Sequence, residues 1–485
     1  MLGKMCSKMS VGRLVLVGAT LLGLNPGCVL RPTKPPQPEL PAAFEQSSAS
    51  SVAAWPSADW YRGFASSELD ALVAQAQAGN LDIAKAEARI RQADARARQA
   101  HAAILPSVEA TGNPHYMAGH AFSGSTGHEF DWSALLSATY EVDFWGKNRA
   151  ALDSAAAAGI ASRADRDTVA ITTLTGIADT YFLVLSLRER LGLARLNVEA
   201  ARTLTDVAAA RYKEGLVTPV EIAAQRAVLA VSEILIPDLQ QQQQEALSAL
   251  AVLVGRAPEG FTIQADGLEV LQEPAVAPGL PSDLLLRRPD IMSAEANLAS
   301  ASADLIAARA AFFPSLTLTA AGGLQDPALN AAVNTISGIG PAISLSASLT
   351  QPIFNNGKLR AARAEAQAKE EELSLEYRSA IVTALVDVEN ALAGIRHLDD
   401  AKDAQNESVL QTQRAFDAAQ ARFKAGTGDY LSVLEAQRAL FTVRDQFGQY
   451  RLARLQALVG LFKALGGGWQ SPPAAHRSTP DNARS

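Results

Sequence analysis

The sequence predicts an α+β membrane protein. Each chain supplies four strands to a trimeric, twelve-stranded transmembrane β-barrel, which continues into a long helical tube. Two observations carry this prediction: the chain contains an internal duplication of a long helical pattern, and short stretches between the helices alternate between apolar and polar residues. The first pattern is typical of paired long helices, and the second of strands that face lipid on one side.

The duplication is visible in residues that recur 211 positions further along the chain, such as Gly146 and Gly357. The other pairs at this spacing are Arg211-Tyr212-Lys213 with Arg422-Phe423-Lys424, Gly215 with Gly426, Pro237 with Gly448, and Gly255 with Gly466. Closer to the start of each copy, Asp82 and Asp290 recur at a spacing of 208. The duplication therefore covers most of the chain, with a three-residue insertion in the second copy.

The hairpin of each copy begins with a very long helix, because no proline falls in the 69 residues from its first glycine to its turn glycine. Such a helix is roughly 100 Å long. Its apolar residues step by four and three, as in a coiled-coil seam: Ala170, Leu174, Ile177, Tyr181 and Val184 in one copy, and Ile381, Leu385, Val388, Leu392 and Ile395 in the other. A returning helix follows each turn and carries a helix breaker, Pro237 or Gly448.

Between the helices the period of the apolar pattern changes to two. Four stretches alternate in this way: Val108–Thr111, Ser137–Phe144, Ser315–Thr319 and Ile343–Thr350. Strands of about ten residues with one apolar and one small, polar face match transmembrane barrel strands. We expect two of them in each half, at about 104–145 and 313–354, with Glu141 and Asp143 on the polar face.

A membrane strand cannot leave an unpaired edge in lipid, so the predicted sheet has to close on itself. Four strands are too few, because the smallest usual barrels need about eight. A homotrimer supplies twelve strands and also gathers six helical hairpins into one tube. The polar segments between the strands of each half, 115–129 and 325–337, are expected to be loops at the outer surface.

The N-terminus predicts export and lipid attachment. In residues 1–27, three basic residues precede an apolar run that ends at Leu24 and is too short to span a bilayer. The segment that ends at Cys28 resembles the cleavage box of bacterial lipoproteins, so we expect Cys28 to be lipidated. Val29 replaces the Asp that retains lipoproteins at the inner membrane, which favours the outer membrane.

These patterns divide the chain into six segments. They are a signal peptide (1–27), a lipid-anchored extended segment (28–59), a first repeat (60–255) with its hairpin at 146–255, a connector or equatorial segment (256–288), a second repeat (289–466) with its hairpin at 357–466, and a disordered tail (467–485).

Composition excludes several classes of function. The net charge of −7 argues against a nucleic-acid partner. Both cysteines, Cys6 and Cys28, lie near the N-terminus, so a disulfide framework or a cysteine metal site is excluded. The sequence has no phosphate loop, zinc helix or nucleophile–histidine arrangement, so we expect no enzyme activity, no cofactor and no metal.

Four segments carry a family resemblance when taken together and in order. They are Tyr140–Lys147, Gly279–Ile291, Leu349–Phe354, and Arg422–Gly426 with Ala436–Arg438. Over about residues 55–469 the chain resembles the TolC-like outer-membrane efflux factors, in particular the lipoprotein branch with the OprM-type channels. The resemblance implies a homotrimer with a twelve-stranded barrel in the outer membrane lipid, a twelve-helix periplasmic α-barrel and an equatorial domain. It also implies a passive exit duct for small molecules such as drugs, joined by a periplasmic adaptor to an inner-membrane pump of the resistance-nodulation-division type.

The two turns between the long helices are the place where such a duct can open and close. The resemblance implies inward-facing acids at Glu221 and Glu435, and Asp429 is a third acid on these turns. The expected charge partners are Arg226, Arg422 and Arg438. The simpler interpretation is that the acids only favour the helix dipole and that the arginines are solvated.

The turns also resemble the family's docking segment for adaptor hairpins. That segment corresponds to Gly215, Leu216 and Gly426. Two other functions stay open at this point: the exit duct of a type I protein-secretion system, and a periplasmic coiled-coil scaffold without a pore. The lipoprotein box and the Arg287-Arg288-Pro289 segment favour efflux.

Overall fold

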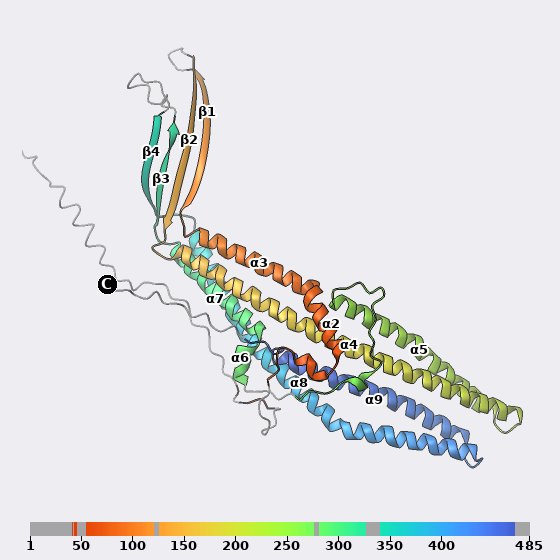
Figure 1. Cartoon of the computed structure of the whole chain (residues 1–485). Coiled ribbons are helices and arrows are strands. Elements are labelled where there is room, and N and C mark those ends of the chain that lie inside the picture. Colours follow the sequence, from red (N-terminus) through yellow and green to blue (C-terminus); the bar gives the residue numbers. More distant parts are fainter. Residues whose placement is uncertain are drawn as a thin grey trace, which may run out of the picture. The chain divides into compact units, whose positions relative to one another are not determined.

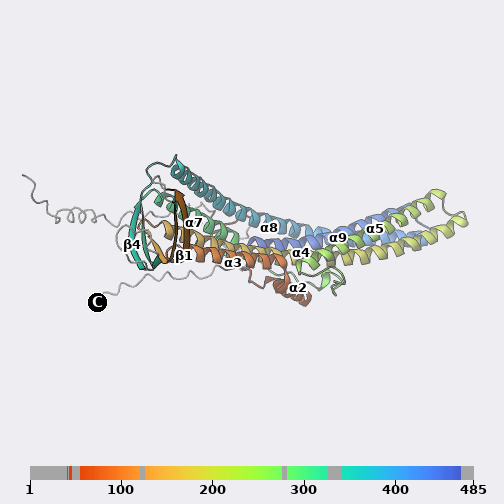
Figure 2. The same cartoon turned by 90° about the horizontal axis from the view of Figure 1, so that it is seen from above.

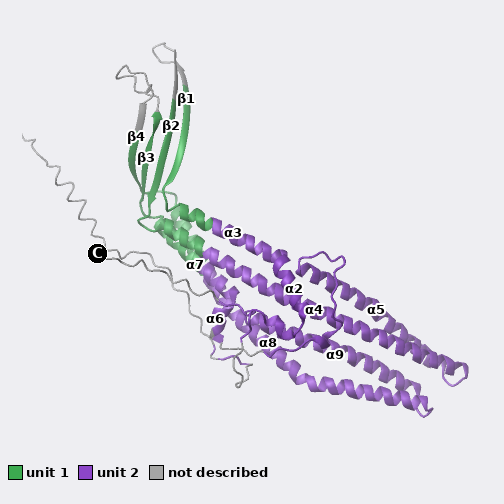
Figure 3. Ribbon diagram, viewed as in Figure 1, with its two compact units in different colours: residues 1–34, 96–156, 299–371 green, residues 35–95, 157–298, 372–485 purple. Residues whose placement is uncertain are grey.

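The computed structural model describes residues 41, 43–45, 55–120, 126–275, 281–325 and 340–470. The predicted signal peptide, Cys28 and most of the predicted tail lie outside these ranges. The chain forms two compact units (Figure 3). The described parts of the first unit fall in Arg96–Ala156 and Ala299–Glu371, and those of the second in Pro35–Ala95, Ala157–Leu298 and Glu372–Ser485. Each unit therefore takes segments from both copies of the sequence repeat.

The first unit contains one antiparallel sheet in the order β1-β2-β3-β4 (Figure 1). Its strands are β1 (Ser107–His120), β2 (Thr126–Val142), β3 (Ser315–Gln325) and β4 (Gly340–Thr350). The prediction of a loop at 115–129 is therefore wrong for most of these residues. They belong to β1 and β2, which stay paired as far as His120 and Thr126. Polar residues and glycines there hide the alternation, while backbone pairing continues. Most of the second expected loop, at 325–337, lies outside the described residues.

The register gives this sheet one apolar and one polar face. Ala138 pairs with Val108 on one side and with Ala320 on the other, and Ala320 pairs with Leu345. Paired residues share a face, so apolar side chains align across the four strands. Ile343 and Leu345 on this face are 88% and 84% exposed. The opposite face aligns Ser137, Thr139, Glu141, Thr317, Thr319, Ser344, Ser346 and Ser348.

The two long hairpins have equal helix lengths. Helices α4 (Lys147–Lys213) and α8 (Lys358–Lys424) each have 67 residues, and the returning helices α5 (Pro219–Leu253) and α9 (Tyr430–Ala464) each have 35. In both views α4 runs beside α5, and α8 beside α9 (Figures 1 and 2). The expected helix breakers do not interrupt either returning helix: α5 continues through Pro237 and α9 through Gly448.

The shorter elements flank these hairpins. They are η2 (Trp60–Phe64), α2 (Ser67–Gly79), α3 (Leu81–Ala102), η3 (Leu268–Val270), η4 (Pro281–Asp283), α6 (Leu284–Arg287) and α7 (Pro289–Ala310). Asn80 links α2 to the first hairpin, since its Nδ2 donates to the Leu253 carbonyl oxygen at 2.7 Å.

The largest apolar core of the second unit surrounds the middle of α4. The predicted seam residues Ile177, Tyr181 and Val184 are fully buried there, against η2, α2 and the end of α9. A second core holds Ile381 and Val388 of α8 against Leu284 and Ile291. By length and composition, α4 contains a stretch apolar enough to cross a membrane, but half of that stretch is buried inside the protein. Packing inside the chain therefore accounts for the buried half of this stretch.

Arg288 explains part of the Gly279–Ile291 signature. This arginine is 8% exposed, and it forms ion pairs with Asp290 at 2.6 Å and with Asp387 of α8 at 3.0 Å. Its Nη1 also donates to the carbonyl oxygen of Ala464, the last residue of α9, at 3.2 Å. The signature thus ties the connector to both helices of the second hairpin.

Candidate functional site

The two hairpin turns have the same local structure. Gly215 and Gly426 have φ angles of 75° and 73°, the left-handed conformation that glycine adopts without strain. The Leu216 and Thr427 N–H groups donate to the carbonyl oxygens of Arg211 and Arg422, at 2.9 and 3.0 Å. These bonds close a helix with a Schellman motif, so the duplicated sequence fixes the same helix ending twice.

Two of the predicted gate acids begin the returning helices. The Thr218 N–H donates to the Glu221 carboxylate at 2.5 Å, and the Glu221 N–H donates to the Thr218 hydroxyl at 3.3 Å, which is a capping box. Asp429 is the N-cap of α9 and accepts from the N–H and hydroxyl of Ser432, both at 2.8 Å. These bonds hold the pKa of Asp429 below its usual value. Both carboxylates thus have helix-capping roles.

The predicted charge latch does not form within one chain. Glu435, Arg226, Arg422 and Arg438 are exposed. Among the described residues, no ion pair joins Glu221, Asp429 or Glu435 to these arginines. A role for these residues in closing the duct stays a prediction that requires a second copy of the chain.

Arg211 is a contact residue that sequence reasoning missed. Its Cζ lies 4.0 Å from the centroid of the Phe423 ring, and its Nη2 donates to the Phe423 carbonyl oxygen at 3.3 Å. Arg211 lies near the end of α4 and Phe423 near the end of α8, so this contact joins the two hairpins beside their turns. The duplication indicates that an aromatic residue recurs at this point, since Phe423 is equivalent to Tyr212. The sequence does not reveal which arginine of one repeat contacts which ring of the other.

A small apolar core lies beside this contact. It contains Leu204, Ala208, Val228, Phe423, Tyr430, Val433 and Leu434, from all four long helices. We call this set the tip core. The rings of Phe423 and Tyr430 lie 5.2 Å apart between centroids. Burial raises the pKa of the Tyr430 phenol, and the nearby Glu221 charge raises it further.

Several polar atoms near the tip core are buried without a hydrogen-bond partner among the described residues. They are the Tyr430 hydroxyl, the Gln225 Oε1, and both side-chain amide atoms of Gln437. Gln225 and Gln437 are both 0% exposed. An unsatisfied buried polar group costs about 1–3 kcal/mol, so these side chains reduce the stability of this end of the hairpins in the isolated chain.

The junction between β2 and α4 is a second ordered site. The Asp143 carboxylate accepts from the N–H groups of Asn148 and Arg149, at 3.2 and 2.9 Å, and so caps α4. Glu141 pairs with Lys147 at 2.6 Å. Asp143 was expected to lie in the strand. This expectation is wrong, because β2 ends one residue earlier, at Val142. This arrangement explains why acidic and basic residues surround the glycine in the Tyr140–Lys147 segment.

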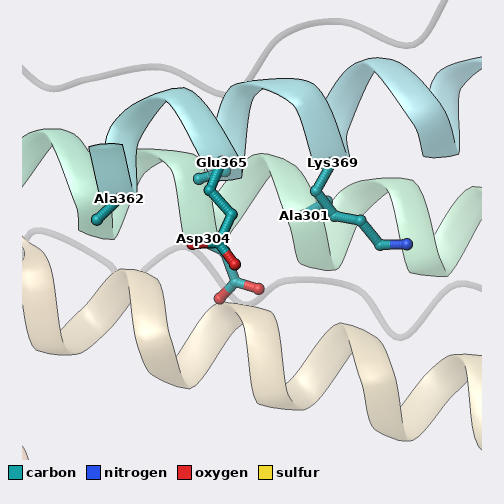
Figure 4. A pocket seen from close by; sticks show the side chains of 6 residues that line it. Ala301, Asp304, Ala362, Glu365 and Lys369 are labelled. Carbon is teal, nitrogen blue, oxygen red and sulfur yellow. The ribbon is translucent and has the colours of Figure 1, made fainter. Parts of the chain in front are cut away.

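The first unit also contains a small pocket between α7 and α8 (Figure 4). It is lined by Ala301 and Asp304 of α7 and by Ala362, Glu365, Ala366 and Lys369 of α8. Its volume of about 220 Å³ is below the roughly 300–1,000 Å³ typical of small-molecule sites. Over the described residues, no group of three or more His, Cys, Asp or Glu side chains is arranged to hold a metal ion.

Comparisons with known proteins agree with this fold. The sequence matches the family described as Outer membrane efflux protein over residues 72–256 and 280–467. It is 42% identical over 420 residues to the pyoverdine export outer membrane protein OpmQ of Pseudomonas aeruginosa, covering 85% of this chain and 88% of that protein. It is 30% identical over 455 residues to the cation efflux system protein CusC of Escherichia coli, covering 91% and 96%. The structure of the open-state MtrE outer membrane channel of Neisseria gonorrhoeae matches with a TM-score of 0.77 at 26% identity, covering 90% and 99%.

These matches confirm the predicted fold class and the internal duplication, because the family pattern occurs twice and the long helices and four strands per chain follow solved channels. They also confirm the outer membrane location and the absence of an enzyme function, since the relatives are channel components of efflux systems. A coiled-coil scaffold without a pore is thereby excluded. The chain belongs to the outer membrane efflux protein family, whose members are the outer-membrane channels of efflux systems.

Proposed function

We propose that three copies of this chain form one channel, which is the exit duct of a tripartite efflux pump. The observation that carries this proposal is the four-stranded sheet with one exposed apolar face and no strand paired to the outer edges of β1 and β4 among the described residues. Unpaired edges are not stable in lipid, and four strands are too few to close. Three copies supply twelve strands, and their Ser, Thr and Glu side chains then line a polar passage.

The periplasmic end of this duct is the proposed gate. The acids lie at the turns, where six hairpins of a trimer converge. Asp429 and Glu435 are exposed, and Glu221 is half-buried. Arg226, Arg422 and Arg438 are exposed on the same helices and are available to a neighbouring copy. Charge pairs between copies would supplement the helix caps that Glu221 and Asp429 already form.

The proposed partners follow from the same assembly. A periplasmic adaptor docks on the turns at Gly215, Leu216 and Gly426, where Leu216 is 68% exposed. An inner-membrane pump of the resistance-nodulation-division type delivers the substrate, and a lipid on Cys28 anchors the chain. Mass spectrometry of the mature protein tests the anchor, which an unmodified thiol at Cys28 would disprove.

The exported compound is proposed to be a small organic molecule of the siderophore class. The relative of 42% identity exports pyoverdine, whereas the named cation efflux relative is 30% identical. Secretion of a whole protein, as in a type I system, is the second candidate. Deleting the gene and measuring siderophore and protein in the medium separates the two: loss of a secreted protein with unchanged siderophore export would favour the type I duct.

Conductance in planar bilayers tests the channel and its gate. The purified protein should form discrete channels that are mostly closed, and Glu435→Ala should raise the closed-level conductance if this acid braces the gate. Ser408→Ala, a neutral change at an exposed position on α8, serves as the matched control. Inserted protein that does not conduct even after charge removal at Glu221 and Glu435 would disprove the duct. An unchanged closed level in Glu435→Ala would remove this residue from the gate.

A further inference from the structure

The contact between Arg211 and Phe423 has an equivalent pair of residues in the sequence repeat, Arg422 and Tyr212, which do not contact each other in the described part of the chain. Arg422 is equivalent to Arg211, and Tyr212 is equivalent to Phe423, both at the repeat spacing of 211 residues. The two pairs thus contain the same chemistry, an arginine at one hairpin and an aromatic ring at the other. Within the described ranges of one chain, Arg211 and Phe423 meet and the equivalent pair does not.

The second pair is exposed in the isolated chain. The Arg422 side chain is exposed, and Tyr212 is 44% exposed although it is a large aromatic residue. Over the described part of the chain, neither side chain has a hydrogen bond or an ion pair; only their backbone carbonyls accept bonds in the turns. Both side chains are therefore available to a second copy.

A closed ring of six hairpins alternates first and second hairpins. Each second hairpin has the first hairpin of its own chain on one side and the first hairpin of the next copy on the other. The duplication makes these two boundaries similar, because the helices have equal lengths and the turns have the same structure. We infer that Arg422 stacks on Tyr212 of the neighbouring copy, as Arg211 stacks on Phe423 within the chain. This inference rests on the proposed trimeric channel.

The apolar side chains around the two contacts differ in size. Within the chain, the tip core supplies Leu204, Val228 and Leu434 beside the Arg211 contact. At the boundary between copies, the equivalent residues are Ala415, Ala439 and Ala223. Alanine buries much less apolar surface than leucine or valine, so the boundary between copies has less hydrophobic stabilisation. The Arg422–Tyr212 contact therefore provides a larger share of the attraction there, and the duct opens between copies before the two hairpins of one chain separate.

Crosslinking between paired cysteines tests the contact without relying on transport. Tyr212→Cys with Arg422→Cys, treated in membranes with a short bismaleimide, should give covalent dimers and trimers on a denaturing gel. Arg211→Cys with Phe423→Cys should crosslink within one chain and migrate as a monomer. The unsubstituted protein measures the background from Cys28. If the 212/422 pair yields only monomers while native trimers are present, the inference is wrong.

Channel recordings test what the contact does. Arg422→Ala and Tyr212→Ala should each raise the open probability by about fivefold to tenfold, the range expected for losing one partly desolvated cation–π contact. The double variant should do no more than either single one, because both remove the same contact. Lys213→Ala, an exposed charge in the same turn, is the control and should leave the recordings unchanged.

The outcomes separate the two claims. Fully additive effects of Arg422→Ala and Tyr212→Ala, or an Arg422→Ala variant that behaves like Lys213→Ala, would overturn the contact while leaving the channel in place. Unsubstituted protein that neither forms trimers nor conducts would overturn the channel and the contact together.

Discussion

Arg190 of α4 forms a two-point ion pair with Asp445 of α9: its Nε lies 2.7 Å from Oδ1 and its Nη2 lies 3.2 Å from Oδ2. A second pair, Arg451 with Glu189 at 2.8 Å, joins the same two helices. Gly448 lies beside the first pair, and a Cβ at this position would approach the Arg190 Cγ to 3.5 Å. The two hairpins of one chain are thus linked by charge at mid-length and by the Arg211–Phe423 contact at the turns.

Removing the mid-length link should lower stability. Arg190→Ala should reduce the free energy of unfolding of the helical hairpins by about 1–2 kcal/mol, because the pair is bidentate but the Asp445 side chain is 41% exposed. Urea unfolding followed by the helical circular dichroism signal measures this loss. Arg202→Ala breaks the exposed pair with Glu233 inside the first hairpin and should cost less than about 1 kcal/mol. Equal losses in both variants would contradict the proposed importance of the link.

Substitution of Arg288 should destabilise the fold, even when lysine replaces it. Arg288→Ala leaves Asp290 and Asp387 without their partner and the Ala464 carbonyl without its donor, which we expect to cost about 3–5 kcal/mol. Arg288→Lys keeps the charge but loses the planar fork, so it should recover only part of the loss. Arg287→Ala, next to it, serves as control because the Arg287 Cζ lies 4.8 Å from the Trp55 ring centroid, a weaker contact than the ion pairs of Arg288. Trimer yield and thermal unfolding measure all three, and a fully stable Arg288→Lys would contradict the need for the fork.

The same substitution should have opposite effects at two buried tyrosines. Tyr430→Phe removes a buried hydroxyl without a partner among the described residues, so it should be neutral or stabilise the tip by up to about 1–2 kcal/mol. Tyr181→Phe removes a hydroxyl within 3.1 Å of both Ser66 and Glu68, and should destabilise the core by about 1–3 kcal/mol. Thermal unfolding of the two variants checks the difference. A destabilised Tyr430→Phe would show that the hydroxyl has a partner in the assembled channel.

Asp179 predicts a pH dependence. Burial raises its pKa to about 6, although the Lys463 charge acts in the opposite direction. A carboxyl whose folded pKa exceeds its usual 3.8 stabilises the fold only when protonated. Its contribution is therefore full below about pH 4 and is lost as the pH rises through about 6.

Asp179→Asn should abolish this dependence. At pH 7 the variant should be more stable than the unsubstituted protein by no more than about 3 kcal/mol, while at pH 4 the two should agree. Asp206→Asn, an exposed carboxyl on the same helix, should not change the profile. Unfolding midpoints across this pH range measure the effect, and parallel curves for both variants would show that Asp179 is not perturbed.

The sequence predicted the repeated elements well because periodicity and turn glycines are local signals. Most seam residues of α4 are buried as expected; in α8, Ile381 and Val388 are buried and the other three are partly buried. Gly215 and Gly426 adopt the turn conformation. The length of the first two strands was underestimated. Residues His115–His120 pair through their backbone, and their side chains show no alternation of apolar and polar residues that would indicate a strand. Pro237 was expected to interrupt its helix, but α5 continues through this exposed proline to Leu253.

The contacts of the candidate site were harder to predict for a different reason. Arg211 and Phe423 are 212 residues apart, and nothing local to either residue indicates the other. Sequence analysis selected Arg422 as a charge partner and not Arg211, whereas among the described residues it is Arg211 that joins the two hairpins. Likewise, Asp143 looked like one more polar strand residue until the end of β2 made it a helix cap.

The equal lengths of α4 and α8, 67 residues each, constrain how this protein can evolve. One added residue in a single copy would displace its turn by about 1.5 Å and rotate it by about 100° relative to the other. The six ends of an assembled mouth would then no longer lie in one plane. Insertions and deletions in these helices are therefore tolerated only as matched pairs, and the channel can lengthen or shorten only in coordinated steps.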